Sequence, residues 1–523
     1  MKMQKEKLKK NGLAGFVFIG LFLFFHPLNF ASAGVLRQST ANPRYFTDGN
    51  NPAIYLTGSH TWDILACEVT ARCYNYNDYL NYMQKYGFNF LRLWISKEIA
   101  WRRDSSGKID HHEPKVYQRT GPGNALDGGL KFDLTKINPV FIQKLKDIIV
   151  SAQSKEIYVS LMLFEGWWNA DASYRPGAWH GHPFNPANNI NTSSATTENI
   201  HTLNNTQVVN LQKSYVRAVI DAVNGYDNIM FEIVNEDARG ATAWQIEMMN
   251  TIRQHEATKP KKHLVWLTTQ SWSTNDNWMW NSTADVVSPT GIEYYNSPTE
   301  PYIINPPVAN GPKAVILDTD HFLGRSTPTD WSRMIWKAFF RGYNPIVMDP
   351  YIYHPTWKLE PDLLPAASRT MIYAKKMNMA NIVPSNNVND CSTIYCLRNP
   401  GKEYLVYQPN SGSFTANLVA GNYDHEWFNP VTGSISPSGT ITVSNGNRNF
   451  NPPFSGQAIL YLKSKSQLPG DFNGDNKVNT LDYEIMKTEF FKVLPSYRAD
   501  MNGKDGVNDL DYELLRREFG KKK

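Results

Sequence analysis

The sequence predicts an α/β protein in which a closed (β/α)8 barrel is followed by a small antiparallel β-sandwich and a short helical segment. Three observations lead to this prediction: eight apolar runs between residues 53 and 349, amphipathic helical patterns between them, and closely spaced turns after residue 392. Apolar runs without alternation are typical of parallel strands that helices cover. An open doubly wound sheet fits less well, because TGSHTWD, the turn after the first run, lacks a glycine-rich phosphate pattern.

Each predicted strand is a short apolar run. The runs are AIYLTG (53–58), FNFLRLW (88–94), IYVSLMLF (157–164), NIMFEIV (228–234), HLVWLTT (263–269), DVVSP (285–289), KAVILD (313–318) and NPIVMD (344–349). Apolar residues at three and four spacing predict helices in NDYLNYMQKYG, NPVFIQKLKDIIVSAQSK, TQVVNLQKSYVRAVIDAVNG, TDWSRMIWKAFFRG and near residues 362–377. Strands and helices that alternate in this way predict the eight-stranded barrel.

Changes in composition divide the chain into four parts. Residues 1–33 combine a basic head, an apolar run and the small residues Ala31, Ser32 and Ala33, which predicts a secretory signal peptide. The other predicted parts are the barrel (34–385), the sandwich (386–466) and the helical segment (467–523). The signal segment carries five lysines and one glutamate, so its removal lowers the formal net charge from +5 to +1. We therefore expect an exported protein with no membrane anchor after cleavage and no charge-based reason to bind nucleic acid. A retained anchor is the alternative.

The four cysteines form two local couples, Cys67 with Cys73 and Cys391 with Cys396. In an exported protein such short spacings favour two small-loop disulfides. A zinc site is less consistent with the sequence, because no CxxC or nearby histidine completes a ligand set.

Polar and aromatic residues lie in the last part of the predicted strands or follow them, at the end of the barrel where active sites are built. They are His60, Trp62, Asp63, Arg92, Trp94, Glu165, Trp167, Asn235, Glu236, Gln270, Trp272, Asp318, Asp320, His321 and Asp349. Aromatic residues make up 13% of the chain, which suits either flat ligands such as sugars or large aromatic cores. Trp62 and Trp167 fit stacking or ordinary packing, and His60 and His321 fit ligand contacts or structural hydrogen bonds.

The stretch FEIVNEDARG carries a buried strand directly into Asn235, Glu236 and Asp237. Glycoside hydrolysis needs two carboxyl groups, one to protonate the leaving oxygen and one to attack the sugar or activate water. Candidates for the second group are Asp318 and Asp320 in VILDTDHF, which project to one side of the strand because they are two residues apart. Asp320 lies at the mouth, whereas Asp318 lies deeper and is expected to hold a neighbour in place.

The motifs NPRYFTDGNNPAIYLTGSHTW, GFNFLRLW, VNED and ILDTDHF resemble clan A glycoside hydrolases, specifically apiosidase-like and cellulase-like TIM barrels of bacterial polysaccharide degradation. The resemblance covers roughly residues 42–380. It implies that Glu236 is the acid/base, that Asn235 binds the sugar hydroxyl next to the reacting carbon, and that the nucleophile ends the seventh strand.

By this resemblance Asp320 is the expected nucleophile, and Arg92 is expected to keep it ionised. Asp349 and Glu165 remain reserve candidates for the second carboxyl, and Asp318 is a further alternative. The substrate-binding set is expected to comprise Arg92, Asn235, His60, Trp62, Glu165, Trp167, His321 and Asp349. A retaining mechanism is the hypothesis, with inversion as the alternative and no cofactor for catalysis.

The last part of the chain contains a twelve-residue loop twice, 29 residues apart: DFNGDNKVNTLD (471–482) and DMNGKDGVNDLD (500–511). Oxygen-bearing residues at positions 1, 3, 5, 9 and 12, with a backbone carbonyl at 7, have the spacing that binds Ca²⁺. The expected ligands are Asp471, Asn473, Asp475, Lys477, Asn479 and Asp482 in the first loop and Asp500, Asn502, Asn508 and Asp511 in the second. Lys504 occupies position 5 of the second loop and Asp505 is displaced by one, which predicts weaker or altered ligation.

This segment resembles a type I dockerin, which implies docking onto a cohesin module of a scaffold protein. The predicted sandwich resembles a module that is appended to such barrels and named for collagen binding. Together the resemblances imply a secreted glycoside hydrolase, extracellular or at the cell surface in a cellulosome-like complex, that cleaves O-glycosidic bonds of a polysaccharide. The alternative is a non-catalytic protein that binds carbohydrate or matrix protein.

Overall fold

The structure is a computed structural model of the whole chain, and much of it is described in detail. The described residues are 34–69, 73–103, 106–169, 177–237, 241–268, 277–289, 305–318, 328–348, 363–436, 438–465, 470, 472, 477–489, 501, 507–519 and 521. The predicted signal segment lies outside them.

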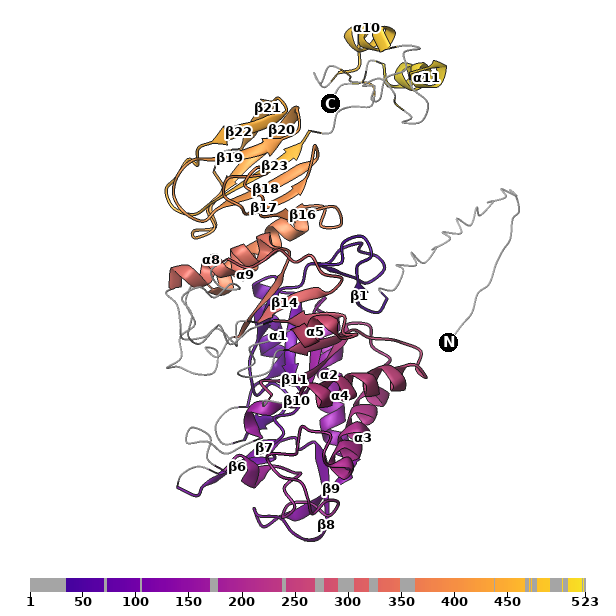
Figure 1. The fold of residues 1–523 in the computed structure, drawn as a ribbon, viewed down its shortest axis with the longest axis vertical. Helices are drawn as coiled ribbons and strands as arrows, with labels where there is room; N and C mark the ends of the chain where they lie inside the picture. The colour runs from indigo at the N-terminus through magenta and orange to yellow at the C-terminus, as the bar shows by residue number, and fades with distance from the viewer. Residues whose placement is uncertain are drawn as a thin grey trace, which may run out of the picture.

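Eight parallel strands close into a barrel, as the sequence predicts. In chain order they are β3 (Gly58–His60), β5 (Phe90–Trp94), β10 (Tyr158–Glu165), β11 (Ile229–Asn235), β12 (Val265–Thr268), β13 (Val286–Ser288), β14 (Ala314–Asp318) and β15 (Asn344–Met348), and β15 pairs with β3 to close the ring. The helices around the strands are α1 (Tyr76–Lys85), α2 (Pro139–Gln153), α3 (Thr206–Val223), α4 (Thr242–Glu256), α5 (Asn277–Asn281), α8 (Pro328–Phe340) and α9 (Leu363–Lys376) (Figure 1). Three of them begin at asparagine N-caps, which satisfy free backbone N–H groups of the first turn.

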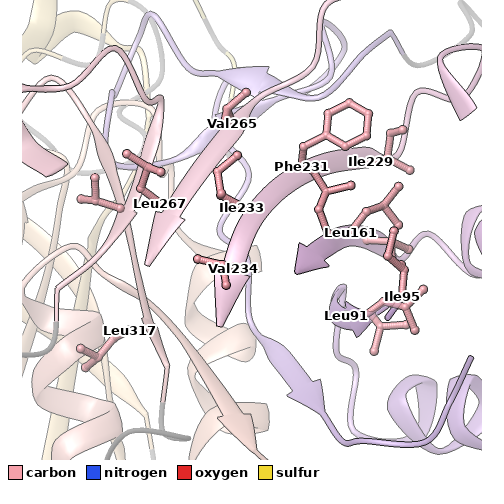
Figure 2. Close-up of a cluster of buried hydrophobic side chains, with 14 of the residues drawn as sticks. Leu91, Ile95, Leu161, Ile229, Phe231, Ile233, Val234, Val265, Leu267 and Leu317 are labelled. Carbon is pink, nitrogen blue, oxygen red and sulfur yellow. The ribbon is translucent and has the colours of Figure 1, made fainter. Parts of the chain in front are cut away.

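Side chains of the barrel strands alternate between two layers. Residues such as Leu161, Phe231 and Ile233 point outward into the main apolar cluster under the helices (Figure 2). Met230 and Trp266 belong instead to a separate apolar cluster inside the barrel, at the end where the strands begin. The inward positions nearer the strand ends hold polar residues, which form the candidate site.

The first strand begins later than the apolar run at 53–58 predicts. Ile54 pairs with Phe46 in an antiparallel bridge outside the barrel, so the chain joins the barrel ladder only at Gly58. A Cβ at Gly58 would lie 1.7 Å from the carbonyl oxygen of Phe90. Glycine is therefore required for β3 to approach β5 this closely.

An unpredicted lobe of strands follows the second barrel strand. It contains β6 (Trp101–Arg103), β7 (Ile109–Glu113), β8 (Tyr117–Asn124) and β9 (Leu130–Ile137), and β7 also pairs with β4 (Cys67–Glu68) from the preceding loop. The segment 177–205, which includes the short helix η2 (Trp179–Gly181), packs on this lobe through a parallel bridge between Phe132 and Asn189. These strands are rich in polar residues, so no apolar run marks them.

Two sheets follow the barrel. One has the order β16 (Val383–Ser385), β17 (Cys396–Asn399), β18 (Glu403–Gln408), β23 (Ala458–Ser464), β20 (Gly421–Phe428) and β21 (Gly439–Val443), and the other pairs β19 (Phe414–Leu418) with β22 (Gly446–Phe450). A smaller antiparallel pair, β1 (Arg37–Gln38) and β2 (Phe46–Thr47), precedes the barrel. Both predicted disulfides, Cys67–Cys73 and Cys391–Cys396, are present.

Two short helices end the described chain, α10 (Thr480–Glu489) and α11 (Asp509–Glu518). Each begins at position 10 of its twelve-residue loop, so the 29-residue repeat of the sequence is also a structural repeat. Among the helices of the described ranges, none combines the length and the hydropathy that crossing a bilayer requires.

Candidate active site at the barrel mouth

The ends of the barrel strands bring the predicted site residues together. Glu165 and Asn235 are register partners at the ends of β10 and β11. His60 ends β3, Trp94 ends β5, and Asp318 ends β14. All five side chains are buried. Parallel strands present their carboxyl ends at one face of the barrel, so these groups form one polar layer there.

Arg92 lies at the centre of this layer and is fully buried. Its Nε and Nη2 atoms donate to Glu232, with the shortest distance 2.6 Å from Nη2 to Oε1. Nη1 donates to Asp318 Oδ2 at 2.6 Å, and Nη2 donates to Asn235 Oδ1 at 2.8 Å. A planar guanidinium suits this forked arrangement, because its donors have fixed directions. Arg92 therefore fixes one carboxylate from β11 and one from β14.

Asp318 also contacts His60, whose Nε2 lies 2.7 Å from Oδ1. Burial lowers the pKa of His60, although the neighbouring Asp318 opposes the shift. A neutral His60 then donates from Nε2 to Asp318. Asp318 is thus held by two neighbours in the barrel interior, and the expectation that it holds a neighbour in place stays a prediction.

Glu165 occupies the mouth side of the layer. Its carboxyl group accepts hydrogen bonds from Trp94 Nε1 at 2.6 Å, from the Trp167 backbone at 2.9 Å and from Asn235 Nδ2 at 3.2 Å. Burial raises the pKa of Glu165 to about 7, although these donors favour its ionised form. The Asn235 amide is oriented at both ends, because Arg92 donates to its oxygen and Glu165 accepts from its nitrogen.

Glu236 directly follows this layer and is half-buried. Its backbone has φ 41°, in the left-handed region that non-glycine residues rarely adopt. Trp62 and Trp167 are also half-buried, so part of each ring reaches the surface near the strand ends. The structure therefore brings Glu236 to the mouth directly after Asn235, and its carbonyl oxygen lies against Gly166, the residue that follows Glu165.

Three predicted site residues, Asp320, His321 and Asp349, lie outside the described residues. The expected contact between Arg92 and Asp320 stays a prediction. The described carboxylate partners of Arg92 are Glu232 and Asp318.

The sequence does not point to several charged side chains that the structure places in or near the mouth. Glu232 lies within an apolar run, and a charged residue in a strand buried on both faces was the signal that could have identified it. Glu98, His182 and His201 follow no predicted strand end directly, and they contact Asp237 or one another in the structure. Lys97 also pairs with Asp63, which links the loops after the first two strands.

The C-terminal loops have described residues only near their ends. Asp482 and Asp511 are fully buried at position 12 of each loop. Asp482 accepts hydrogen bonds from the backbone of Phe472 at 2.6 Å and of Asn479 at 2.9 Å. Asp471, Asn473, Asp475, Asp500 and Asn502 lie outside the described residues, and within the described ranges no group of three or more His, Cys, Asp or Glu residues forms a metal site.

Comparisons with known proteins found matches for the C-terminal region and for the fold of the barrel and sandwich. Residues 469–520 match the family model of the dockerin type I domain. A solved glycoside hydrolase is 14% identical, with 83% of this chain and 98% of that chain covered and a TM-score of 0.51. A glycoside hydrolase of family 5 from Bacteroides vulgatus is 14% identical over 83% and 94%, with a TM-score of 0.52. A candidate glycoside hydrolase from the same organism is 13% identical over 83% of each chain, with a TM-score of 0.56.

No curated protein matches this chain. Identities this low establish the fold alone. The chain is therefore similar in fold to TIM-barrel glycoside hydrolases and carries a region that matches a type I dockerin.

Proposed function

We propose that the chain is a secreted glycoside hydrolase that cleaves O-glycosidic bonds of a polysaccharide. The observation that carries the proposal is the position of Asn235 and Glu236 at the barrel mouth, beside a layer in which Arg92 organises two buried carboxylates. Carboxyl groups with different surroundings are what acid and nucleophile roles require.

In the proposed retaining mechanism, Asp320 attacks the anomeric carbon while the glycosidic C–O bond breaks. The leaving oxygen takes the proton of Glu236. Water then attacks the glycosyl ester, loses its proton to the Glu236 carboxylate and releases Asp320. This route needs carboxyl groups ~5–5.5 Å apart, whereas inversion needs ~6.5–9.5 Å.

Asn235 is proposed to bind the hydroxyl next to the reacting carbon. Its amide is held between Arg92 and Glu165, which fixes the direction of its remaining N–H. Trp62 and Trp167 are proposed to stack on sugar rings, because half-buried aromatic faces suit the polarised CH groups of sugars. His60, His321, Glu165 and Asp349 complete the proposed substrate-binding set.

The test is the substitution Glu236→Gln, assayed on a panel of plant and bacterial polysaccharides for released sugar. An enzyme that depends on Glu236 should lose turnover by about 10²–10⁴-fold while substrate binding persists. Wild-type levels of hydrolysis in the variant would reject the role of Glu236. Binding without turnover in the wild-type protein would favour the alternative, a non-catalytic carbohydrate- or matrix-binding protein.

We further propose that residues 467–523 dock onto a cohesin module of a scaffold outside the cell, in a calcium-dependent way. The residues present fit Ca²⁺, because fully buried Asp482 and Asp511 occupy the last ligand position of each loop and a buried carboxylate is stabilised by a cation. Asp471, Asn473, Asp475, the Lys477 carbonyl and Asn479 would complete the first site, and Asp500, Asn502 and Asn508 the second. Bound calcium would supply charge neutralisation and order to the loops.

Two exposed leucines support a docking surface on this region. Leu481 and Leu510 are 61% and 62% exposed and occupy position 11 of the two loops. Cohesin binding should be lost in excess chelator and weakened by the double substitution of both leucines by aspartate. Binding that persists in excess chelator would reject the calcium-dependent proposal.

A further inference from the structure

Three separate loops of the barrel mouth meet at His201. Its Nδ1 atom lies 2.9 Å from Asp237 Oδ1, and its Nε2 atom lies 3.3 Å from Glu98 Oε2. Asp237 directly follows Glu236, Glu98 belongs to the loop after β5, and His201 precedes α3. All three side chains are buried, with Asp237 at 0% exposure. The imidazole therefore bridges two carboxyl groups away from solvent.

The charges of this group are mutually stabilised. Burial alone would lower the pKa of His201, but Asp237 and Glu98 raise it to about 10. Burial alone would raise the pKa of Glu98, but His201 and His182 lower it to about 2. His182 also lies 3.2 Å from Glu98 Oε2, and burial lowers its own pKa. His201 is thus the cation of the group, and among the described residues the hydroxyls of Tyr117 and Tyr215 also face Glu98.

Neighbouring side chains fix the orientation of the His201 ring. Trp244 stacks on it with centroids 4.0 Å apart and an interplanar angle of 18°, and Phe164 meets its edge. A cation over the face of an indole is attracted by the ring. The Asn169 Nδ2 atom lies 2.8 Å from His201 Nδ1. An imidazolium only donates, so a charged His201 requires this amide to turn its oxygen toward the ring.

The same region holds two of the five non-glycine residues with positive φ in the described chain, Glu98 at 61° and Glu236 at 41°. Such conformations persist only where the surroundings enforce them, and they often mark functional sites. The peptide between Glu236 and Asp237 also rests on the backbone of Gly166. A Cβ atom added to Gly166 would lie 2.4 Å from Asp237 Cα and 2.7 Å from the Glu236 carbonyl oxygen.

We propose that Glu98, His201 and Asp237 form a charged clamp that positions Glu236 for proton transfer to the leaving group. The inference rests on the proposed function of Glu236 as acid/base. His201 holds the Asp237 side chain, Gly166 packs against the peptide between Glu236 and Asp237, and together they keep Glu236 in its left-handed backbone conformation. Glu98, His201 and Asp237 are positioning residues, because they act through Glu236 and its backbone.

The clamp predicts a defect confined to proton donation. A misplaced acid slows the departure of a poor leaving group, which needs a proton, more than the departure of a good one, which does not. General damage to the active site would slow the hydrolysis of substrates with poor and with good leaving groups alike. Leaving-group dependence therefore separates positioning of Glu236 from a general loss of active protein.

The experiment compares wild type, His201→Gln, Asp237→Asn and Glu236→Gln on alkyl and 2,4-dinitrophenyl glycosides of the sugar that the wild type releases. For the clamp variants kcat/KM should fall by about 10²-fold on the alkyl glycoside, the usual effect of a misplaced group, and only slightly on the activated one. His263→Gln is the matched control. His263 is buried and pairs with Glu256 at 2.6 Å before β12, away from the mouth, so its loss should leave both rates unchanged.

Each outcome has one meaning. If Glu236→Gln shows the leaving-group pattern and the clamp variants match wild type on both substrates, the clamp is overturned and the proposed function stands. If Glu236→Gln itself hydrolyses the alkyl glycoside at the wild-type rate, the proposed function fails. Equal losses on both substrates in His201→Gln and Asp237→Asn would also overturn the positioning role.

A second measurement needs no activity. In ¹⁵N-labelled protein at pH 8, one histidine should carry a proton on both ring nitrogens, and its signals should vanish in His201→Gln. Absence of a doubly protonated histidine at pH 8 would overturn the charged clamp even if the variant fails to fold.

Discussion

The β-sandwich and the C-terminal helical region both follow the barrel in the chain, but they are joined to it differently. Buried residues of the sandwich, including Tyr407, Phe428 and Tyr461, belong to the same apolar cluster as the barrel helices. The C-terminal region has a cluster of its own, with the buried residues Phe472, Val478, Met486, Val507 and Leu515. The order of modules along a chain therefore does not show which of them can be separated. A shared apolar core shows that the sandwich cannot be, whereas a separate core indicates that the C-terminal region can.

The sandwich interface is extensive because α8 and α9 lie between the barrel and the sandwich (Figure 1). Trp336 on α8 packs against Phe428 with centroids 6.1 Å apart, and Phe340 stacks on Tyr407 at 5.4 Å. Tyr373 on α9 donates to Glu426 at 3.0 Å. Separating the two parts would expose these rings to water, at a cost of about 1.5–3 kcal/mol for each large apolar side chain.

Truncation should show the largest difference between the two modules in their effect on the stability of the remaining chain. A chain that ends at residue 465 should unfold at the wild-type temperature and retain activity, because the barrel–sandwich core is intact. A chain that ends at residue 385 should be insoluble or lack a cooperative transition, since α8 and α9 would lose their apolar cover. Calorimetry and sedimentation of the two purified chains make the test. A soluble, cooperatively folded chain ending at 385 would contradict the shared core.

Calcium removal should unfold the C-terminal helical region and leave the barrel and sandwich folded. Five buried apolar residues are too few to stabilise two short helices, so the C-terminal region should depend on its metal. We expect chelation to melt α10 and α11 and to leave the main thermal transition unchanged. Hydrogen exchange followed by mass spectrometry can locate the change. Protection that persists in residues 480–489 and 509–518 in chelator would show a metal-independent fold.

The sequence predicts the barrel well because each strand is a continuous apolar run, and the helices because apolar residues recur with helical spacing. It misplaces the start of β3, since Ile54 is apolar but pairs with Phe46 outside the ring. It also hides Glu232 inside an apolar run. Strand ends indicate Asn235 and Glu236 directly, whereas Arg92 is indicated as a charged residue inside the second apolar run. The contact of His201 with Glu98 joins two loops that only the folded chain brings together, so no local pattern can predict it.

Single core substitutions test whether the sandwich unfolds together with the barrel. Phe428→Ala should lower the free energy of unfolding of the barrel and sandwich together by about 3–5 kcal/mol, the usual cost of deleting a buried phenylalanine. Met486→Ala removes a fully buried side chain of the C-terminal cluster. It should leave the unfolding transition of the barrel and sandwich unchanged. Chemical denaturation monitored by tryptophan fluorescence compares the two variants. Two separate transitions in Phe428→Ala, one for each part, would contradict a common core.

The pH dependence of stability should come from the barrel and involve the Glu98–His201 pair. The raised pKa of His201, about 10, contributes stability that is full below 6.5 and declines as the pH rises toward 10. The lowered pKa of Glu98, about 2, contributes stability that is full above 4.5 and declines as the pH falls toward 2. The difference in the free energy of unfolding between wild type and His201→Gln should therefore be largest between pH 4.5 and 6.5.

Thermal unfolding across this range, with His263→Gln as the control, measures the difference. A constant difference from pH 4 to 9 would mean that His201 contributes through packing and not through its charge.

Polar contacts between the barrel helices and the sandwich should make the smallest contribution to the free energy of unfolding. Arg369 on α9 donates from Nη1 to the carbonyl oxygens of Pro430 at 2.8 Å and Val431 at 2.7 Å. Arg369→Ala leaves both carbonyls to water and should cost about 1–2 kcal/mol in the common transition, since each such bond is worth about 1 kcal/mol net. Arg448→Ala is the matched control, because Arg448 donates to Thr442 O at 3.2 Å within the sandwich and on its exposed side. If both substitutions cost the same, these hydrogen bonds do not join the two parts, and the aromatic contacts alone account for their union.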